Sequence, residues 1–175
     1  MRAVTWVGRN VWIAVLALAV GFVASAVAAD TELERRMLAG LAGVYVLVGD
    51  MKPDAEKDGL AGSTLQTDVE LKLRQAGIRV LTSGEWLAAP GNPSLYLFVG
   101  TVKNETGLYA YYINLELHQE VRLTRNPAIT SLATTWHAPG FVGIVLDRNL
   151  SKVRDGVRDV VDQFLNAYLA ANPKR

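Results

Sequence analysis

Glutamate and histidine alternate in one stretch of the chain, at Glu116, His118 and Glu120. A period of two places these three side chains on one face of a β-strand. An imidazole and a carboxylate in such a row can ligate a metal ion if a neighbouring strand adds further ligands. A water-exposed sheet face has the same polar alternation, and no second histidine stands at strand or helix spacing from His118. The sequence therefore favours a solvated face and predicts neither a metal site nor a cofactor.

The second histidine, His137, follows a predicted strand and precedes a Pro-Gly loop. Histidine titrates near neutral pH, so at a strand end it can serve as a general base. Ser131 and Asp147 supply the residue types of a catalytic triad, but the sequence has no Gly-x-Ser-x-Gly turn. The chain also lacks cysteine, which excludes disulfides, thiolate nucleophiles and cysteine-ligated metals. No catalytic residue is assigned, and a hydrolase or metal enzyme using His118 or His137 ranks third among the functional interpretations.

Aromatic residues give the strongest indication of function. The predicted strand over residues 95–102 is apolar on both faces. If helices cover one face of its sheet, the other face is partly apolar and requires a cover. That cover is a partner protein, a second copy of the chain or a ligand, unless the loops over 50–59 and 83–93 fold onto it. The candidate binding residues are the aromatic side chains on or beside the sheet: Tyr96, Phe98, Tyr112, Trp136 and Trp86.

Hydrophobic periodicity predicts the elements that position these side chains. Residues 108–123 alternate over their whole length, with an apolar face interrupted only by Gln119, which is typical of a half-buried antiparallel strand. Polar loops are expected over residues 49–59 and 83–93. Helices are predicted over residues 32–38, from 63 or 64 to 76, and over about 20 residues from a cap at Ser151 to Pro173; strands are predicted over 44–48, 78–81, 95–102, 108–123 and 129–136.

These elements predict an α/β fold of the two-layer sandwich type. The three strands between residues 95 and 136 follow one another through short turns and form an antiparallel meander. Strand, helix and strand over residues 44–81 suggest a parallel crossover, so the sheet of about five strands is mixed. The two main helices are amphipathic and pack on one face of the sheet.

The first 29 residues have the order of a secretory signal peptide. Arg2 and Arg9 supply positive charge, an apolar core over residues 11–20 follows, and small residues end the segment at Ala28 and Ala29. An uncleaved membrane anchor is the alternative, because residues 11–29 carry no charge. The sequence predicts cleavage after Ala28 or Ala29, a periplasmic or secreted protein, and no membrane span after cleavage.

Residues 30–175 are expected to form a single domain, which is ordinary for this length. Of the 18 basic side chains two lie in the leading segment, which leaves 16 against 17 acidic ones. A nearly neutral domain without a basic block lacks the electrostatic surface that phosphate backbones require. Nucleic acid is therefore excluded as an expected partner.

Residues 67–81, TDVELKLRQAGIRVL, describe a helix that leads into a strand through a glycine. This segment, with the long strand over 108–123 and the C-terminal helix behind it, resembles small periplasmic α/β modules of bacterial envelope proteins. Among these are the N-terminal domain of the translocation protein TolB and the related domain of curli-type secretion lipoproteins. The resemblance lies in element order, and this chain has no cysteine that could be lipidated. Since such modules usually bind other envelope proteins, the resemblance implies a binding role.

The leading hypothesis is an exported, non-enzymatic envelope domain that binds a protein partner, or itself, through an aromatic sheet face or a sheet edge. The second is a carrier of a small ligand, whose pocket lies between the sheet and the 83–93 loop with Trp86 and Trp136 as walls. The partner, the ligand and the oligomeric state do not follow from the sequence.

Overall fold

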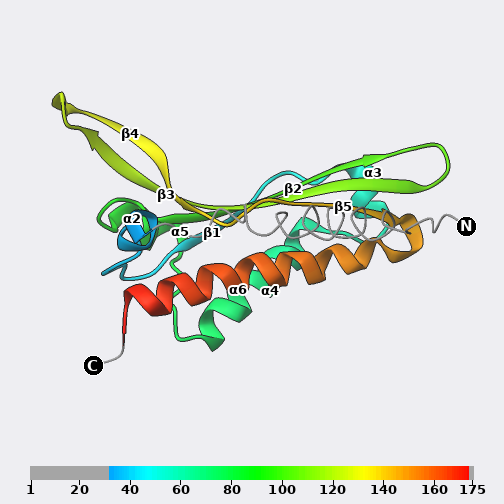
Figure 1. Ribbon diagram of the computed structural model, residues 1–175, viewed down its shortest axis with the longest axis horizontal. Coiled ribbons are helices and arrows are strands. Elements are labelled where there is room, and N and C mark those ends of the chain that lie inside the picture. The colour runs from blue at the N-terminus through cyan, green and yellow to red at the C-terminus, as the bar shows by residue number, and fades with distance from the viewer. Residues whose placement is uncertain (1–31, 174–175) are drawn as a thin grey trace, which may run out of the picture.

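The computed structural model describes residues 32–173, and in it the two long helices pack against one face of a five-stranded mixed sheet (Figure 1). The α/β sandwich predicted from the sequence is confirmed. The elements in chain order are α2 (Glu32–Arg36), β1 (Tyr45–Val48), α3 (Pro53–Lys57), α4 (Gly62–Gln75), α5 (Ser83–Ala88), β2 (Ser94–Lys103), β3 (Leu108–Leu123), β4 (Asn126–His137), β5 (Phe141–Leu146), the 3₁₀ helix η1 (Asp147–Lys152) and α6 (Val153–Ala171).

The strand order is β1-β2-β3-β4, with β5 also paired to β3. β1 runs parallel to β2, and the other pairs are antiparallel, so the predicted mixed sheet with its meander is confirmed. β2 occupies one edge of β3 from Tyr109 to His118, so β5, which pairs with Leu108–Ile113, must lie on the opposite edge. β4 continues along that same edge from Glu116 onward. The long strand β3 therefore pairs directly with three of the other four strands.

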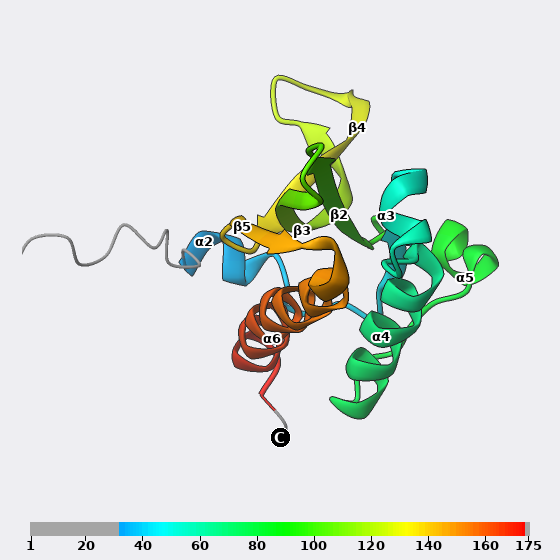
Figure 2. The ribbon, with the colours of Figure 1, turned by 90° about the vertical axis from the view of Figure 1, so that its right-hand side faces the viewer.

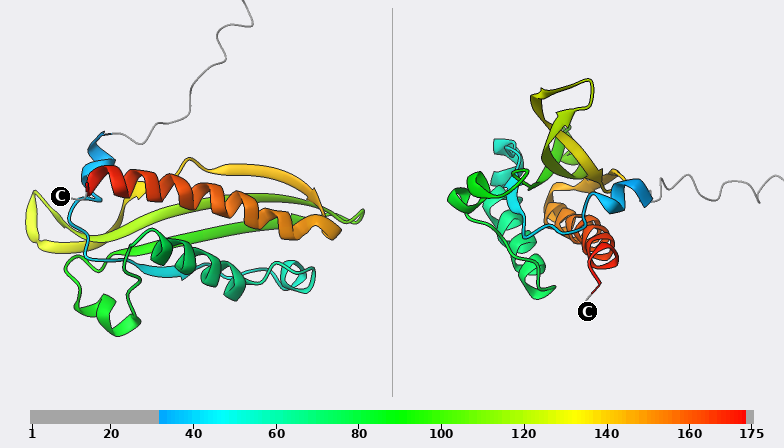
Figure 3. Two further views of the ribbon diagram at one scale, coloured as in Figure 1. Left: turned by 90° about the horizontal axis from the view of Figure 1, so that it is seen from below. Right: turned by 90° about the vertical axis from the view of Figure 1, so that its left-hand side faces the viewer.

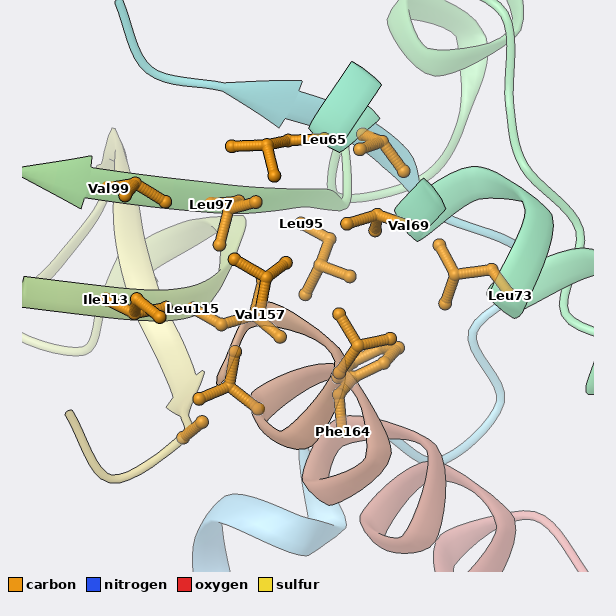
Figure 4. Packing of buried hydrophobic residues seen from close by; sticks show 14 of the residues in the cluster. Leu65, Val69, Leu73, Leu95, Leu97, Val99, Ile113, Leu115, Val157 and Phe164 are labelled. Atoms are coloured by element: carbon orange, nitrogen blue, oxygen red, sulfur yellow. The ribbon is translucent and has the colours of Figure 1, made fainter. Parts of the chain in front are cut away.

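The core lies between the sheet and the two long helices, α4 and α6, which lie on the same side of it (Figure 2). The alternation of β3 is confirmed, since Ile113, Leu115 and Leu117 are fully buried on the helix side. Leu97 and Leu115 meet Val157 and Phe164 in the middle of this layer (Figure 4). Full burial of such a side chain stabilises the fold by roughly 1.5–3 kcal/mol. The apolar stripe of α6 is confirmed by the burial of Val153, Val157, Val160, Val161, Phe164 and Leu165.

The fifth strand is not the one the sequence predicts. Residues 78–81 form only an isolated parallel bridge between Val44 and Val80, because the capped helix α5 begins directly after this short extended segment. The fifth strand is β5, in a segment for which the sequence predicts no helix or strand. Its six residues contain Val, Ile and Phe, a composition typical of strands, but the segment is short and is broken by Gly143.

Two segments predicted as loops contain short helices. α3 lies within residues 49–59 and begins with Pro53 in its first turn. α5 lies within residues 83–93 and has a capping box, in which Thr82 and Glu85 bond each other's backbone N–H groups. The C-terminal helix begins later than predicted, because Ser151 belongs to the 3₁₀ helix and Lys152 precedes the first residue of α6.

The β3–β4 hairpin extends beyond the sheet. β2 begins at Ser94 opposite His118, so β3 pairs only with β4 from Gln119 to its end. The two strands form a ribbon that projects from the body of the molecule (Figure 3). Ile129 and Leu132 on β4 are exposed in this ribbon.

The predicted signal peptide, residues 1–29, lies outside the described residues, and its cleavage remains a prediction. Within residues 32–173, every helix is too short or too polar to cross a bilayer.

Candidate functional site: the open face of the sheet

The face of the sheet opposite α4 and α6 carries a band of exposed apolar side chains. We call this band the open face; it consists of Phe98 and Val102 on β2, Tyr112 on β3, and Val142 and Ile144 on β5. The register joins the three strands, since Gly100 pairs with Tyr112 and Tyr112 with Val142. Val142 and Ile144 are 71% and 68% exposed, while the adjacent β2 residues Leu97 and Val99 are buried on the other side.

Small residues hollow out the middle of the open face. Gly100 and Ala110 leave a groove of about 410 Å³ beside Val102, Tyr112 and Val142. A methyl group added at Gly100 would lie 3.1 Å from the ring of Phe98, so the glycine allows this ring to lie against the strand. The groove is bordered by an exposed Lys52, whose ammonium group has no ion-pair partner within residues 32–173. The result is an apolar groove with the ammonium group of Lys52 at its margin.

The predicted aromatic residues separate into an exposed and a shielded group. Phe98 and Tyr112 lie on the open face and are 38% and 39% exposed. Tyr96 lies on the same face but is half-buried, because its ring stacks on His118 at a centroid distance of 5.6 Å. Trp86 stacks on Tyr45 at 5.3 Å, which places α5 over one end of the face. The 83–93 segment therefore covers this end and leaves the apolar band uncovered.

Trp136 does not belong to this site. The expectation that it contributes to an aromatic binding face is wrong, because Trp136 pairs with Leu117 and its side chain is only 1% exposed in the core. Its ring packs edge-on against Phe164 of α6. In β4, the alternation of side chains between the two faces of the sheet shifts at a bulge near residue 135, and this shift puts Trp136 on the helix side. No residue type in the sequence signals that bulge.

A polar cluster borders the open face where β2, β3 and β4 meet. His118 Nε2 lies 2.7 Å from Glu116 Oε2, Asn114 donates to Glu116 Oε1 at 2.6 Å, and the Thr134 hydroxyl donates to Glu116 Oε2 at 3.0 Å. Partial burial raises the pKa of the Glu116 carboxyl, but the hydrogen bonds from His118, Asn114 and Thr134 outweigh this and lower the pKa below its ordinary value. Glu116 is therefore held as a carboxylate in a satisfied network.

The structure does not assemble the candidate catalytic groups. In residues 32–173 no set of three histidine or carboxylate side chains is arranged to hold a metal ion. His137 Nδ1 instead lies 3.1 Å from a carboxylate oxygen of Glu34, which ties α2 to the end of β4. Ser131 pairs with Val121 in the ribbon, whereas the Asp147 N–H bonds the Gly107 carbonyl at the other end of β3. At about 3.3 Å per strand residue, Ser131 and Asp147 are roughly 45 Å apart along the sheet.

A second hollow, of about 430 Å³, lies between α5 and the β3–β4 ribbon. Trp86 and Leu87 line it on one side, with Glu120 and Leu132 on the other. The indole N–H of Trp86 donates to the Asn92 carbonyl at 2.7 Å, which fixes the ring as one wall. The predicted second wall, Trp136, is absent from this hollow because it is buried in the core.

Searches against protein-family models and against curated proteins find no match to this chain. The resemblance to TolB-like periplasmic modules therefore remains a prediction. The candidate site is therefore inferred from the positions and exposure of its side chains.

Three residues of the open face and its groove were not predicted from the sequence: Val142, Ile144 and Lys52. Val142 and Ile144 were overlooked because β5 was not recognised, although residues 141–146 are a short apolar run bounded by Gly140 and Asp147, which is a strand signal. Lys52 had no local signal, since only the tertiary structure brings it to the groove.

Proposed function

We propose that this protein is an exported, non-enzymatic envelope domain that binds a second protein through the open face. The observation that carries the proposal is the contiguous exposure of Phe98, Val102, Tyr112, Val142 and Ile144 on the face opposite α4 and α6. Aromatic and aliphatic side chains around a depression are typical of the centre of a protein interface.

The chemistry of the groove restricts the partner. Its floor and walls are apolar, so the partner segment inserts apolar side chains above Gly100 and Ala110. Lys52 stands at the margin without an ion pair in the described part of the chain, which favours a carboxylate on the partner nearby. The partner is therefore a segment with an apolar stripe and an acidic flank.

The first test is site-specific photo-crosslinking in the producing cells. A photoreactive residue at Tyr112 is expected to give one adduct with one other protein, whereas the same residue at Arg74, exposed on α4, is expected to give none. Equal adducts from both positions would mean random collision and would overturn the proposal.

The second test uses the purified pair. Phe98→Ala and Tyr112→Ala are each expected to raise the Kd by about tenfold or more, the effect of losing an interface anchor. Leu71→Ala is the matched control, because Leu71 is 52% exposed on α4, away from the open face. Urea unfolding of each variant must stay near that of the parent chain. An unchanged Kd in both open-face variants would contradict the proposal.

The hollow beside Trp86 supports a second candidate function, the carriage of a small apolar ligand. Anilinonaphthalene sulfonate is the probe, and its binding is expected to quench Trp86 emission. Trp86→Phe should abolish the quenching, while Phe98→Ala should preserve it if the ligand occupies this hollow rather than the open face. Quenching lost in Phe98→Ala would reject this candidate.

A further inference from the structure

β5 is an edge strand. Its only strand neighbour is β3, and along its outer side no backbone hydrogen bond is made within residues 32–173. Unpaired N–H and C=O groups along such an edge can accept a strand from another chain.

The register determines which groups point outward. The Asp147 N–H donates to the Gly107 carbonyl at 2.9 Å, so residues 107 and 147 form a hydrogen-bonded pair. These pairs alternate along an antiparallel ladder, so Gly143 and Val145 also point their backbone groups toward β3. The N–H and C=O groups of Val142, Ile144 and Leu146 consequently point away from the sheet.

The edges formed by β4 and by the β1 segment carry protection that β5 lacks. β4 begins with Asn126-Pro127 and contains two irregularities in its register, and Val44, directly before β1, is bridged on its outer side by Val80. Proline, bulges and charges on an edge all hinder pairing with a second chain. β5 has no proline and no charged residue, and its register with β3 is unbroken.

We infer that β5 pairs antiparallel with β5 of a second copy of this chain, about a two-fold axis at Ile144. Centring the pair there sets Ile144 opposite Ile144 of the second copy and Val142 opposite Leu146 of the second copy. This register uses every outward-pointing backbone group of the strand on both chains. It forms one continuous sheet of ten strands from two sheets of five.

Two features favour a second copy over an unrelated strand. Val142 and Ile144 have their side chains on the open face, so the two-fold axis joins two apolar bands into one. The same register also sets Val142 opposite Leu146 of the second copy, so apolar side chains face apolar side chains across the pair.

The inference goes beyond the proposed function, because the edge is used for self-association and the groove stays open to the partner. The dimer would present two grooves on one continuous surface. A partner with two copies of the binding segment would then gain avidity.

Cysteine cross-linking in the full chain tests the register, since the sequence has no cysteine of its own. Cα atoms of a hydrogen-bonded antiparallel pair lie about 5.5 Å apart, within the range for a disulfide. Ile144→Cys is expected to give a covalent dimer on mild oxidation. Val102→Cys is the control, because Val102 is 64% exposed on the same face but lies on β2, on the opposite side of β3 from β5. Equal cross-linking of the two variants, or none in Ile144→Cys, would overturn the inference.

Native mass spectrometry tests the association itself. The parent chain is expected at twice the mass of one chain, and Ile144→Lys at the mass of one chain, because a charge at the axis blocks the pairing. The side chain of Ile144 is largely exposed, so the substitution itself should not destabilise the fold of one chain. The urea midpoint of Ile144→Lys should therefore equal that of the parent chain diluted until its dimer dissociates. A monomeric parent chain, or a dimeric Ile144→Lys, would refute the inference. Phe98→Ala and Tyr112→Ala should retain the dimer mass, so failure of the partner-binding proposal is separately visible.

Discussion

The ring of Trp136 on β4 packs edge-on against the ring of Phe164 on α6, with centroids 5.3 Å apart and planes inclined at 71°. The contact fastens the C-terminal helix to the last strand of the meander, and both side chains are almost fully buried. A tryptophan that the sequence groups with a binding face is therefore a structural anchor.

Trp136→Ala is expected to lower the free energy of unfolding by about 3–5 kcal/mol, the usual cost of truncating a large buried aromatic. Urea unfolding followed by circular dichroism measures this loss. Phe98→Ala serves as the control and should cost much less, because Phe98 is 38% exposed. Similar losses in the two variants would show that the open face belongs to the core.

Tyr109→Phe is expected to destabilise the fold by about 1–2 kcal/mol. The buried Tyr109 hydroxyl donates to Asp58 Oδ2 at 2.8 Å, and Lys103 Nζ lies 2.6 Å from the same oxygen. Burial, followed by this hydrogen bond, raises the pKa of Tyr109 to about 12. Tyr112→Phe is the matched control, because the Tyr112 side chain is exposed on the open face. If both variants unfold at the same urea concentration, the Asp58–Tyr109 bond contributes nothing.

Glu85→Gln is expected to change how stability depends on pH. The backbone N–H of Thr82 and the guanidinium of Arg79 lower the pKa of Glu85 from 4.5 to about 2 in the folded protein. A depressed folded pKa adds stability that is complete above pH 4.5 and disappears as the pH falls toward 2. Urea midpoints of the parent and Glu85→Gln should therefore differ at pH 6 and converge near pH 2.

The matching control for this pH series is Glu105→Gln, at an exposed carboxylate in the turn between β2 and β3. It should follow the parent curve throughout. A difference between parent and Glu85→Gln that stays constant from pH 6 to pH 2 would contradict the assignment.

Gly107→Ala is expected to lower the free energy of unfolding by about 1–2 kcal/mol. Gly107 has a φ of +79°, and an added methyl carbon would lie 2.6 Å from a carboxylate oxygen of Asp147. Gly84→Ala is the comparison: Gly84 lies within α5, where a methyl group meets nothing within 4 Å, so stability should stay equal or rise. Thermal unfolding of both variants checks the sign of each change.

Much of the architecture follows from local pattern. The bounds of β3 agree with the predicted strand over residues 108–123, because a period of two over 16 residues has no competing interpretation. The buried stripe of α6 agrees equally well, since its valines and Phe164 repeat at helical spacing. Short elements were harder to predict from the sequence. Residues 141–146 and 78–81 are similar apolar segments, and only their neighbours in space make the first a strand and the second a single bridge.

The sequence by itself determined the fold class, the sheet order of the meander and the existence of a second apolar face, because these depend on periodicity and on the need to bury amphipathic surfaces. Only the tertiary structure decided which side chains occupy that face. The irregular register of β4 puts Trp136 in the core, and the return of β5 to β3 places Val142 and Ile144 beside Tyr112. Such assignments depend on pairings between segments distant in the chain, and residue spacing within one segment does not encode them.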